Sequence, residues 1–137
     1  MEADTEQTAF LHDAMPFAAV LGAEVVEASP AVVRVRLAWD HTRCTAGGVL
    51  HGGVLMDLAD AAGGLSAFLN LPEGSTGTTT LESKTNLFRA VRAGTVTAES
   101  RVLHAGRSTI VVDTVVQDGD GALVARTTQT QMVLRGA

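Results

Sequence analysis

The segment from Gly52 to Leu69 constrains the fold more than any other part of this 137-residue chain. Nearly every residue in it is Gly, Ala, Val, Leu, Met or Phe, and its only charged residues are Asp57 and Asp60. A run of this length and composition predicts a helix that is apolar on all sides and therefore buried by the rest of the chain. Acids inside such a helix are unusual, because a buried charge needs a partner or a chemical use.

The start of this helix is the second informative feature. His51, Gly52 and Gly53 stand at its beginning, and Asp60 follows Gly52 by eight residues, about two helical turns. A helix that begins with glycines presents free backbone N–H groups at the positive end of its dipole, where negative charge is stabilised. We therefore expect an oxyanion-binding site at the helix start and an acid–base group or nucleophile two turns further in.

The rest of the chain reads mainly as strands. Residues 5–15 have the pattern of a short amphipathic helix that Pro16 ends. A long helix followed by four consecutive strands indicates one α+β domain over residues 1–137, in which an antiparallel sheet curls around the helix. Alternating or β-branched patterns predict strands over residues 23–28, 31–39, 78–88, 95–104, 108–117 and 122–134.

Composition excludes several classes of function. A net charge of −5 provides no basic face, so we expect no nucleic-acid partner. The acidic, polar N-terminus is unlike a signal peptide, and a single cysteine cannot form an internal disulfide, so we expect a cytoplasmic protein. The charges and glycines of the apolar segment argue against a membrane span. No metal site is expected, because no metal-ligand spacing relates His12, His41, His104 and Cys44.

These features together resemble the HotDog-fold acyl-CoA thioesterases, in particular the 4-hydroxybenzoyl-CoA and phenylacetate-pathway enzymes. The similarity extends over residues 17–134. It rests on His51-Gly52-Gly53, on Asp60 nine residues after the histidine, and on the Thr-rich stretch 78–89, which ends in Phe-Arg. In this family a curved antiparallel sheet wraps a central helix, the catalytic acid occupies the position of Asp60, and the N–H of the residue after the histidine forms the oxyanion hole.

The chain departs from the family pattern at two positions. Thr45 stands six residues before His51, where family members often have Asn or Gln, and its hydroxyl makes fewer hydrogen bonds than an amide does. Gly64 stands four residues after Asp60, where one branch of the family carries Thr. The chain is therefore more similar to the branch that combines Asp with a Ser or Thr of the strand after the helix, and Thr80 matches that partner best.

The resemblance implies hydrolysis of an acyl-CoA thioester with an aryl or medium-chain acyl group. Coenzyme A is then part of the substrate, and no cofactor is needed. Asp60 would be the general base or the nucleophile, the Gly52 N–H would stabilise the oxyanion, and Thr80 of the facing subunit would orient the water. His51 would shape the loop or contact the thioester. The other predicted substrate contacts are Thr45, Gly53, Thr79, Arg89, Arg107, Ser108 and Thr109, with the two arginines on the CoA phosphates.

Each assignment has a structural alternative. Asp60 could be a hydrogen-bonded structural acid, Asp57 a subunit contact or a solvated group, and Arg89 and Arg107 surface ion-pair residues. Two other functions stay open. Acyl-thioester hydratases and dehydratases of this fold usually place a His on the helix, and none lies within residues 52–69. Non-catalytic acyl-CoA-binding or oligomerisation modules tend to lack the helix acid.

The expected partners are the acyl-CoA substrate and further copies of this chain. A curved sheet has edge strands, which are commonly covered by another subunit. A thioester site also has to be shielded from bulk water. We therefore expect a homodimer with its active site built across the interface, or a homotetramer formed as a dimer of dimers.

Overall fold

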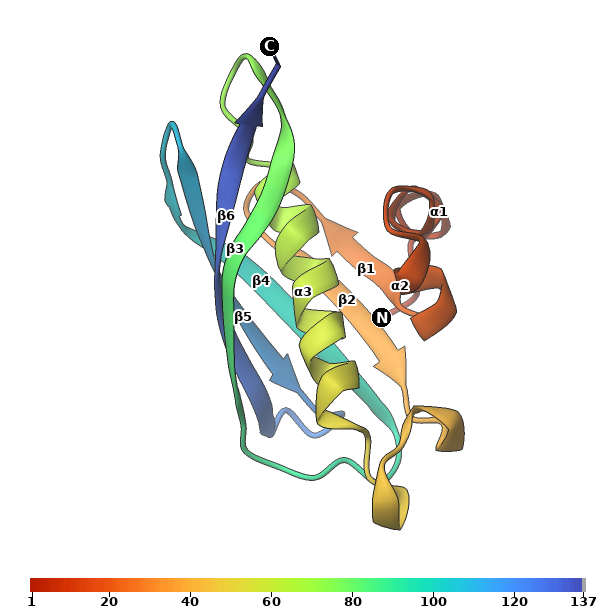
Figure 1. Cartoon of the computed structure of the whole chain (residues 1–137). Helices are drawn as coiled ribbons and strands as arrows, with labels where there is room; N and C mark the ends of the chain where they lie inside the picture. Colours follow the sequence, from red (N-terminus) through yellow and green to blue (C-terminus); the bar gives the residue numbers. More distant parts are fainter. Residues whose placement is uncertain (137) are drawn as a thin grey trace.

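The computed structural model describes residues 1–136 and confirms the α+β HotDog architecture. A six-stranded antiparallel sheet of order β1-β2-β4-β5-β6-β3 curves around one central helix, α3 (Gly52–Phe68) (Figure 1). Every predicted strand is present, with ends within three residues of the expected ones. The strands are β1 (Glu24–Ala28), β2 (Val33–Ala38), β3 (Ser75–Leu87), β4 (Thr95–Ala105), β5 (Thr109–Gln117) and β6 (Leu123–Arg135).

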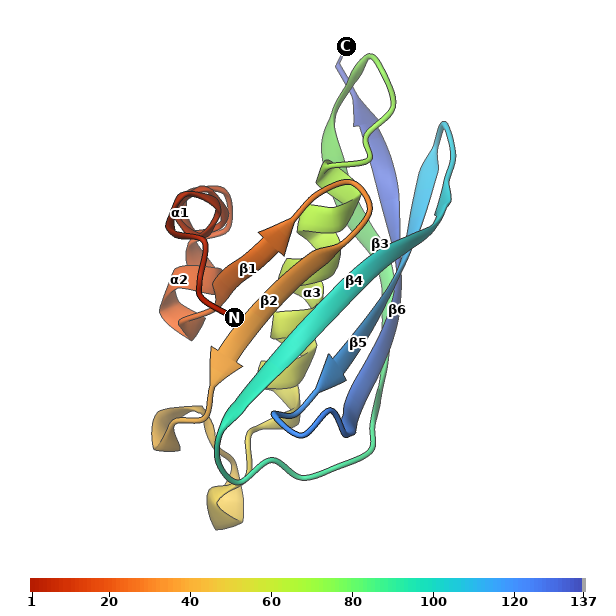
Figure 2. The same ribbon diagram turned by 180° about the vertical axis from the view of Figure 1, so that it is seen from behind.

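The core lies between the concave face of the sheet and α3 (Figure 2). Leu58 and Leu65 of the helix pack there against valines such as Val35 and Val96, and all four side chains are buried. Full burial of a side chain of this size stabilises the fold by roughly 1.5–3 kcal/mol. Alanines and one glycine make up much of the remaining buried helix surface, so the helix backbone can lie close to the strands.

Four hydroxyl side chains cross the sheet within this apolar face. Ser100, Thr114, Thr127 and Thr85 stand opposite one another on β4, β5, β6 and β3. The hydroxyls of Ser100 and Thr114 are 2.6 Å apart, and those of Thr85 and Thr127 are 2.7 Å apart. Pairing in this way satisfies hydroxyl groups that are hidden from water.

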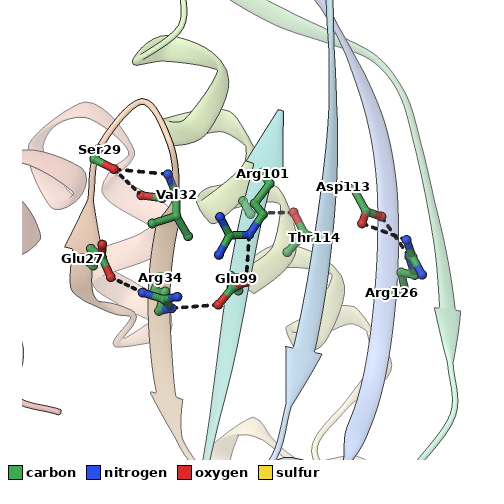
Figure 3. Close-up of polar contacts among 10 residues, drawn as sticks. Glu27, Ser29, Val32, Arg34, Glu99, Arg101, Asp113, Thr114 and Arg126 are labelled. Carbon is green, nitrogen blue, oxygen red and sulfur yellow. Dashed lines mark hydrogen bonds and ion pairs between the residues drawn. The ribbon is translucent and has the colours of Figure 1, made fainter. Parts of the chain in front are cut away.

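The convex face carries ion pairs (Figure 3). Arg34 on β2 contacts Glu27 on β1, and its Nε lies 2.8 Å from the Glu99 carboxylate on β4. Arg126 on β6 pairs with Asp113 on β5, with two N–O distances of 3.0 Å. These cross-strand pairs explain the alternation of arginine and valine in β2, because period two sends one set outward and the other into the core.

The N-terminal region contains one helix more than the sequence predicted. Helix α1 (Thr5–Ala14) begins at Asp4, whose side chain accepts a hydrogen bond from the Gln7 N–H, 2.9 Å away. Pro16 does not only follow this helix but also begins a second one, α2 (Pro16–Leu21). Proline suits the first position of a helix, because its φ angle is fixed and no N–H is needed there. Helix α1 packs beside edge strand β1, and α2 contacts α1 and α3 (Figure 2).

The opposite edge, β3, is uncovered in the single chain. Most of its residues are exposed, and Leu81 and Leu87 show more than half of their surface. The adjacent face of α3 is also open, with Met56 44% and Phe68 45% exposed. The prediction that α3 is buried on all sides is therefore wrong for one chain, because six strands wrap only part of its circumference.

No helix within residues 1–136 is long and apolar enough to cross a membrane.

Candidate active site

His51 is the cap of helix α3. Its Nδ1 accepts a hydrogen bond from the N–H of Gly53, 3.0 Å away, and its carbonyl accepts the N–H of Val54 at 2.9 Å. Nδ1 is therefore not free to act as a base, and the N–H of Gly53 is not free to bind an oxyanion. The geometry favours the loop-shaping role of His51, whose side chain caps the start of the helix.

The capping arrangement leaves the N–H of Gly52 as the free donor at the helix start. Among residues 1–136, the N–H of Gly52 has no hydrogen-bond acceptor. This donor lies at the positive end of the α3 dipole, and so it is suited to bind a developing negative charge. Gly52 also lines a cavity of about 370 Å³ with Thr45, Val49, Leu50, Leu55, Leu87, Phe88, Arg89 and Ala90.

The loop that leads into His51 is fastened by Arg43. Its guanidinium donates to the carbonyls of Leu21 and Ala38, each at 2.8 Å, and its own carbonyl accepts the His51 N–H at 3.0 Å. A side chain on Gly22 would meet this guanidinium, because a Cβ there would lie 2.3 Å from it. One arginine thus ties the end of α2, the end of β2 and the start of α3 together.

Asp60 lies in a different and larger cavity. This space of about 500 Å³ lies between α1, α3 and β3. Asp60 and the threonines of β3 form its polar end. The ring centroids of Phe10 and Phe68, two of its apolar lining residues, are 5.8 Å apart. The lining residues are Phe10, Leu11, Ala14, Met15, Asp60, Gly64, Leu65, Phe68, Gly77, Thr78, Thr79, Thr80 and Gln131.

Two glutamines of β6 hold the polar groups of this cavity. Gln129 Nε2 donates to the Asp60 carboxylate at 3.2 Å, and Gln131 Nε2 donates to the Thr80 hydroxyl at 2.8 Å. Both glutamines are almost fully buried. Sequence reasoning missed them, although a signal was present: they stand two residues apart on the face of β6 that also buries Thr127 and Val133.

Thr80 is expected to act from the facing subunit; the structure places Thr80 and Asp60 in one cavity of the same chain, so a site that uses both needs no second copy of Thr80. Gly52, in contrast, lies far from Asp60 and Thr80. Eight residues of helix separate it from Asp60, a rise of about 12 Å, and the two lie in different cavities. One thioester cannot touch both groups of a single chain.

The residues predicted to contact the CoA phosphates also lie in two separate places. Arg89 lines the Gly52 cavity and, among residues 1–136, makes no ion pair with a carboxylate. Arg107 and Ser108 lie in the turn between β4 and β5, and Thr109 begins β5. This turn is near the C-terminus, whereas α3 begins at the opposite end of the molecule (Figures 1 and 2). The structure does not bring this turn to the Gly52 cavity of the same chain.

Asp57 lies one turn before Asp60. Burial, followed by the negative charge of Asp60, raises the pKa of the Asp57 carboxyl above its usual value. Asp57 lines neither cavity and has no hydrogen-bond partner among the described residues. This position on the open face of α3 suits the subunit contact considered above more than a catalytic role.

No cluster of three His, Cys, Asp or Glu side chains within residues 1–136 could hold a metal ion.

Comparison with known proteins gives consistent results. Residues 47–125, more than half of the chain, match the family model described as "Thioesterase superfamily". The chain is 36% identical over 110 residues to a protein of Saccharolobus solfataricus whose name assigns it provisionally to the esterases; the match covers 80% of this chain and 76% of that one.

Solved structures show the same similarity. A thioesterase from Haemophilus influenzae superposes with a TM-score of 0.86 at 27% identity, over 98% of this chain and 93% of the other. A mutant of the phenylacetic acid degradation protein PaaI from Thermus thermophilus superposes with a TM-score of 0.79 at 29% identity, over 87% and 99% of the two chains.

Proposed function

This chain belongs to the thioesterase superfamily, and from that premise we propose that it hydrolyses acyl-CoA thioesters with aryl or medium-chain acyl groups. The observation that carries the proposal is the position of Asp60 at the polar end of an otherwise apolar cavity. Such a site can hold an apolar acyl group and place a carboxylate next to its reactive carbon.

The chemistry needs a nucleophile and stabilisation of the carbonyl oxygen. A water oxygen attacks the thioester carbon while the Asp60 carboxylate takes the proton, and collapse of the intermediate expels the CoA thiolate, leaving the free acid. In the alternative path Asp60 attacks directly, and water then hydrolyses the mixed anhydride. In both paths Thr80, held by Gln131, can orient the water.

The oxyanion is assigned to the free N–H of Gly52, and this assignment requires two chains. Because about 12 Å of helix separates Gly52 from Asp60, the Gly52 that acts with one Asp60 belongs to the partner subunit. We propose a homodimer with two such sites, in which the partner covers edge strand β3 and the open face of α3. The exposed Leu81, Leu87 and Met56 on these elements support this location of the interface.

The cavity supports the proposed acyl class. Its volume of about 500 Å³ is enough for a ring or a medium-length chain, and the Phe10 and Phe68 rings offer edges and faces to an aromatic acyl group. The similarity to a phenylacetic acid degradation protein supports an aryl group as well. Arg89, beside Gly52 and without a carboxylate partner among the described residues, is the proposed contact for the CoA phosphates.

The test is a screen of acyl-CoAs of different acyl type, with released thiol measured by a thiol-trapping dye. We expect phenylacetyl-, benzoyl- or medium-chain acyl-CoA to be hydrolysed with a higher kcat/KM than acetyl-CoA or palmitoyl-CoA. The Asp60→Asn variant, which keeps the shape of the side chain, should lose about 10²–10⁴-fold in kcat. Absence of thiol release with every acyl-CoA, or an Asp60→Asn variant above about a tenth of the wild-type kcat, would contradict the proposal.

A further inference from the structure

The side chain of Gln129 is buried in a way that does not favour the stability of the fold. It is 1% exposed, and its Nε2 donates to Asp60 at 3.2 Å. Its Oε1 is buried and has no hydrogen-bond partner among residues 1–136. A buried polar atom without a partner destabilises a fold by about 1–3 kcal/mol, and an apolar side chain of the same shape would avoid that loss.

The orientation of the amide follows from the chemistry of its neighbour. An ionised carboxylate can only accept hydrogen bonds, so the nitrogen of the amide faces Asp60 and the oxygen faces away. The bond from Gln129 is the only one that the described residues make to the Asp60 side chain. One carboxylate oxygen is thus fixed to β6, and the other stays available to the cavity that Asp60 lines.

Gly63 makes room for this amide. A Cβ on Gly63 would lie 2.0 Å from Gln129 Oε1 and 2.7 Å from its Cδ. Glycine inside a helix destabilises it by about 1 kcal/mol relative to alanine, and here Gly63 is buried one turn after Asp60. The chain therefore carries a helix-weakening residue at the point where the Gln129 amide packs against the helix backbone.

From this arrangement we propose that Gln129, seated on Gly63, is a positioning residue that fixes the Asp60 carboxylate for the reaction. The inference rests on the proposed function, which supplies the role of Asp60. A second glutamine makes a similar hydrogen bond two residues further along β6, where Gln131 donates to the Thr80 hydroxyl. The two inward-facing glutamines thus hold both side chains that the proposed chemistry uses.

The first test replaces Gln129 by methionine, which has the same length and no hydrogen-bonding amide. We expect kcat to fall about 10- to 100-fold with KM changed less than about twofold, because a hydrogen bond to a charged group is lost while the substrate cavity keeps its shape. The melting temperature should not fall, because the unpaired Oε1 is removed. The matched control is Thr128→Met, an exposed neighbour on β6 facing away from α3, which should leave kcat unchanged.

A double-mutant cycle tests whether Gly63 acts through Gln129. Gly63→Ala should lower kcat in the wild-type background, because its Cβ displaces the amide. In a Gln129→Ala background the space for that Cβ is open, so the same substitution should produce no further loss. Equal losses of kcat in both backgrounds would show that Gly63 acts independently, and that part of the inference would be overturned.

The outcomes separate this inference from the function on which it rests. Activity that is lost in Asp60→Asn but kept in Gln129→Met would overturn the positioning role and leave the proposed function standing. A Gln129→Met variant that keeps its kcat and melts at a lower temperature would show a structural role only. Hydrolysis of no acyl-CoA by the wild type would overturn both.

Discussion

The start and the middle of helix α3 differ in the chemical groups that they present. At its start, the N–H of Gly52 has no acceptor among the described residues and lies beside a small cavity. This cavity is also lined by Arg89, which makes no ion pair within the same part of the chain. Two turns later, a carboxylate held by a buried amide faces a larger, mainly apolar cavity. The start of the helix has the groups that bind negative charge, and its middle has the groups that activate water and accommodate an acyl chain.

This difference explains why one chain does not form a complete site. Both halves of the proposed chemistry come from the same helix, yet about 12 Å of helix separates them. A second chain that packs against the open face of α3 could bring its own helix start to the first chain's Asp60. The uncovered β3 edge and the open face of α3 mark where that second chain would lie.

After Asp60→Asn, the largest effect is expected from removing the hydrogen-bond donor at the helix start. Gly52→Pro deletes the N–H, and proline is compatible with the first helical position and with the extended backbone of His51. We expect kcat to fall about 10²–10³-fold, the range for loss of one oxyanion donor.

Gly52→Ala is the matched control for this variant. It adds the same Cβ, 2.7 Å from the end of the exposed Leu87 side chain, and keeps the N–H. It should therefore retain much more activity than Gly52→Pro in the thiol-release assay. Similar kcat values for the proline and alanine variants would remove the oxyanion role from this N–H.

A smaller effect is expected at the polar end of the Asp60 cavity. Thr80→Val removes the hydroxyl and keeps the shape, and so kcat should fall about tenfold with little change in KM if the hydroxyl orients water. Thr80→Ser keeps the hydroxyl and should stay near the wild-type kcat. An increase in KM at constant kcat would instead place Thr80 in substrate binding.

An effect of similar size, but limited to the larger substrates, is expected at the apolar end of the Asp60 cavity. Gly64 lines the cavity, and a Cβ there would lie 3.1 Å from the Met15 methyl group. Gly64→Val should lower kcat/KM for the best aryl or medium-chain substrate by about tenfold and leave acetyl-CoA within about twofold, because each methylene of pocket space changes binding by about 1–3 kcal/mol. Equal losses for both substrates would show that this cavity does not hold the acyl group.

The fold was predictable because its determinants are periodic and local. The apolar run of α3, the alternation of Arg34 and Arg36 with valines and the turn residues between strands indicated an antiparallel sheet around one helix. The family resemblance, through the spacing after His51, pointed to Gly52 and Asp60 as site residues, and their roles stay predictions. Helix α2 was missed because Pro16 can end one helix and also begin the next, and the sequence does not decide between the two.

The arrangement of the site was less predictable, because it depends on tertiary contacts. Gln129 and Gln131 are ordinary residues of a strand until the curvature of the sheet places them under Asp60 and beside Thr80. Nothing in the spacing of Gly52 and Asp60 shows that they open into different cavities. That separation depends on where α1 and β3 lie around α3.

The central claim, that each site combines Asp60 of one chain with Gly52 of its partner, is tested most directly with mixed dimers. Asp60→Asn and Gly52→Pro chains, carrying different affinity tags, are unfolded together, refolded and purified through both tags. Each mixed dimer then contains one site with both groups intact, so we predict about half of the wild-type activity per dimer, although each parent is nearly inactive. Mixed dimers no more active than their parents would place Asp60 and Gly52 in the site of a single chain and contradict the account.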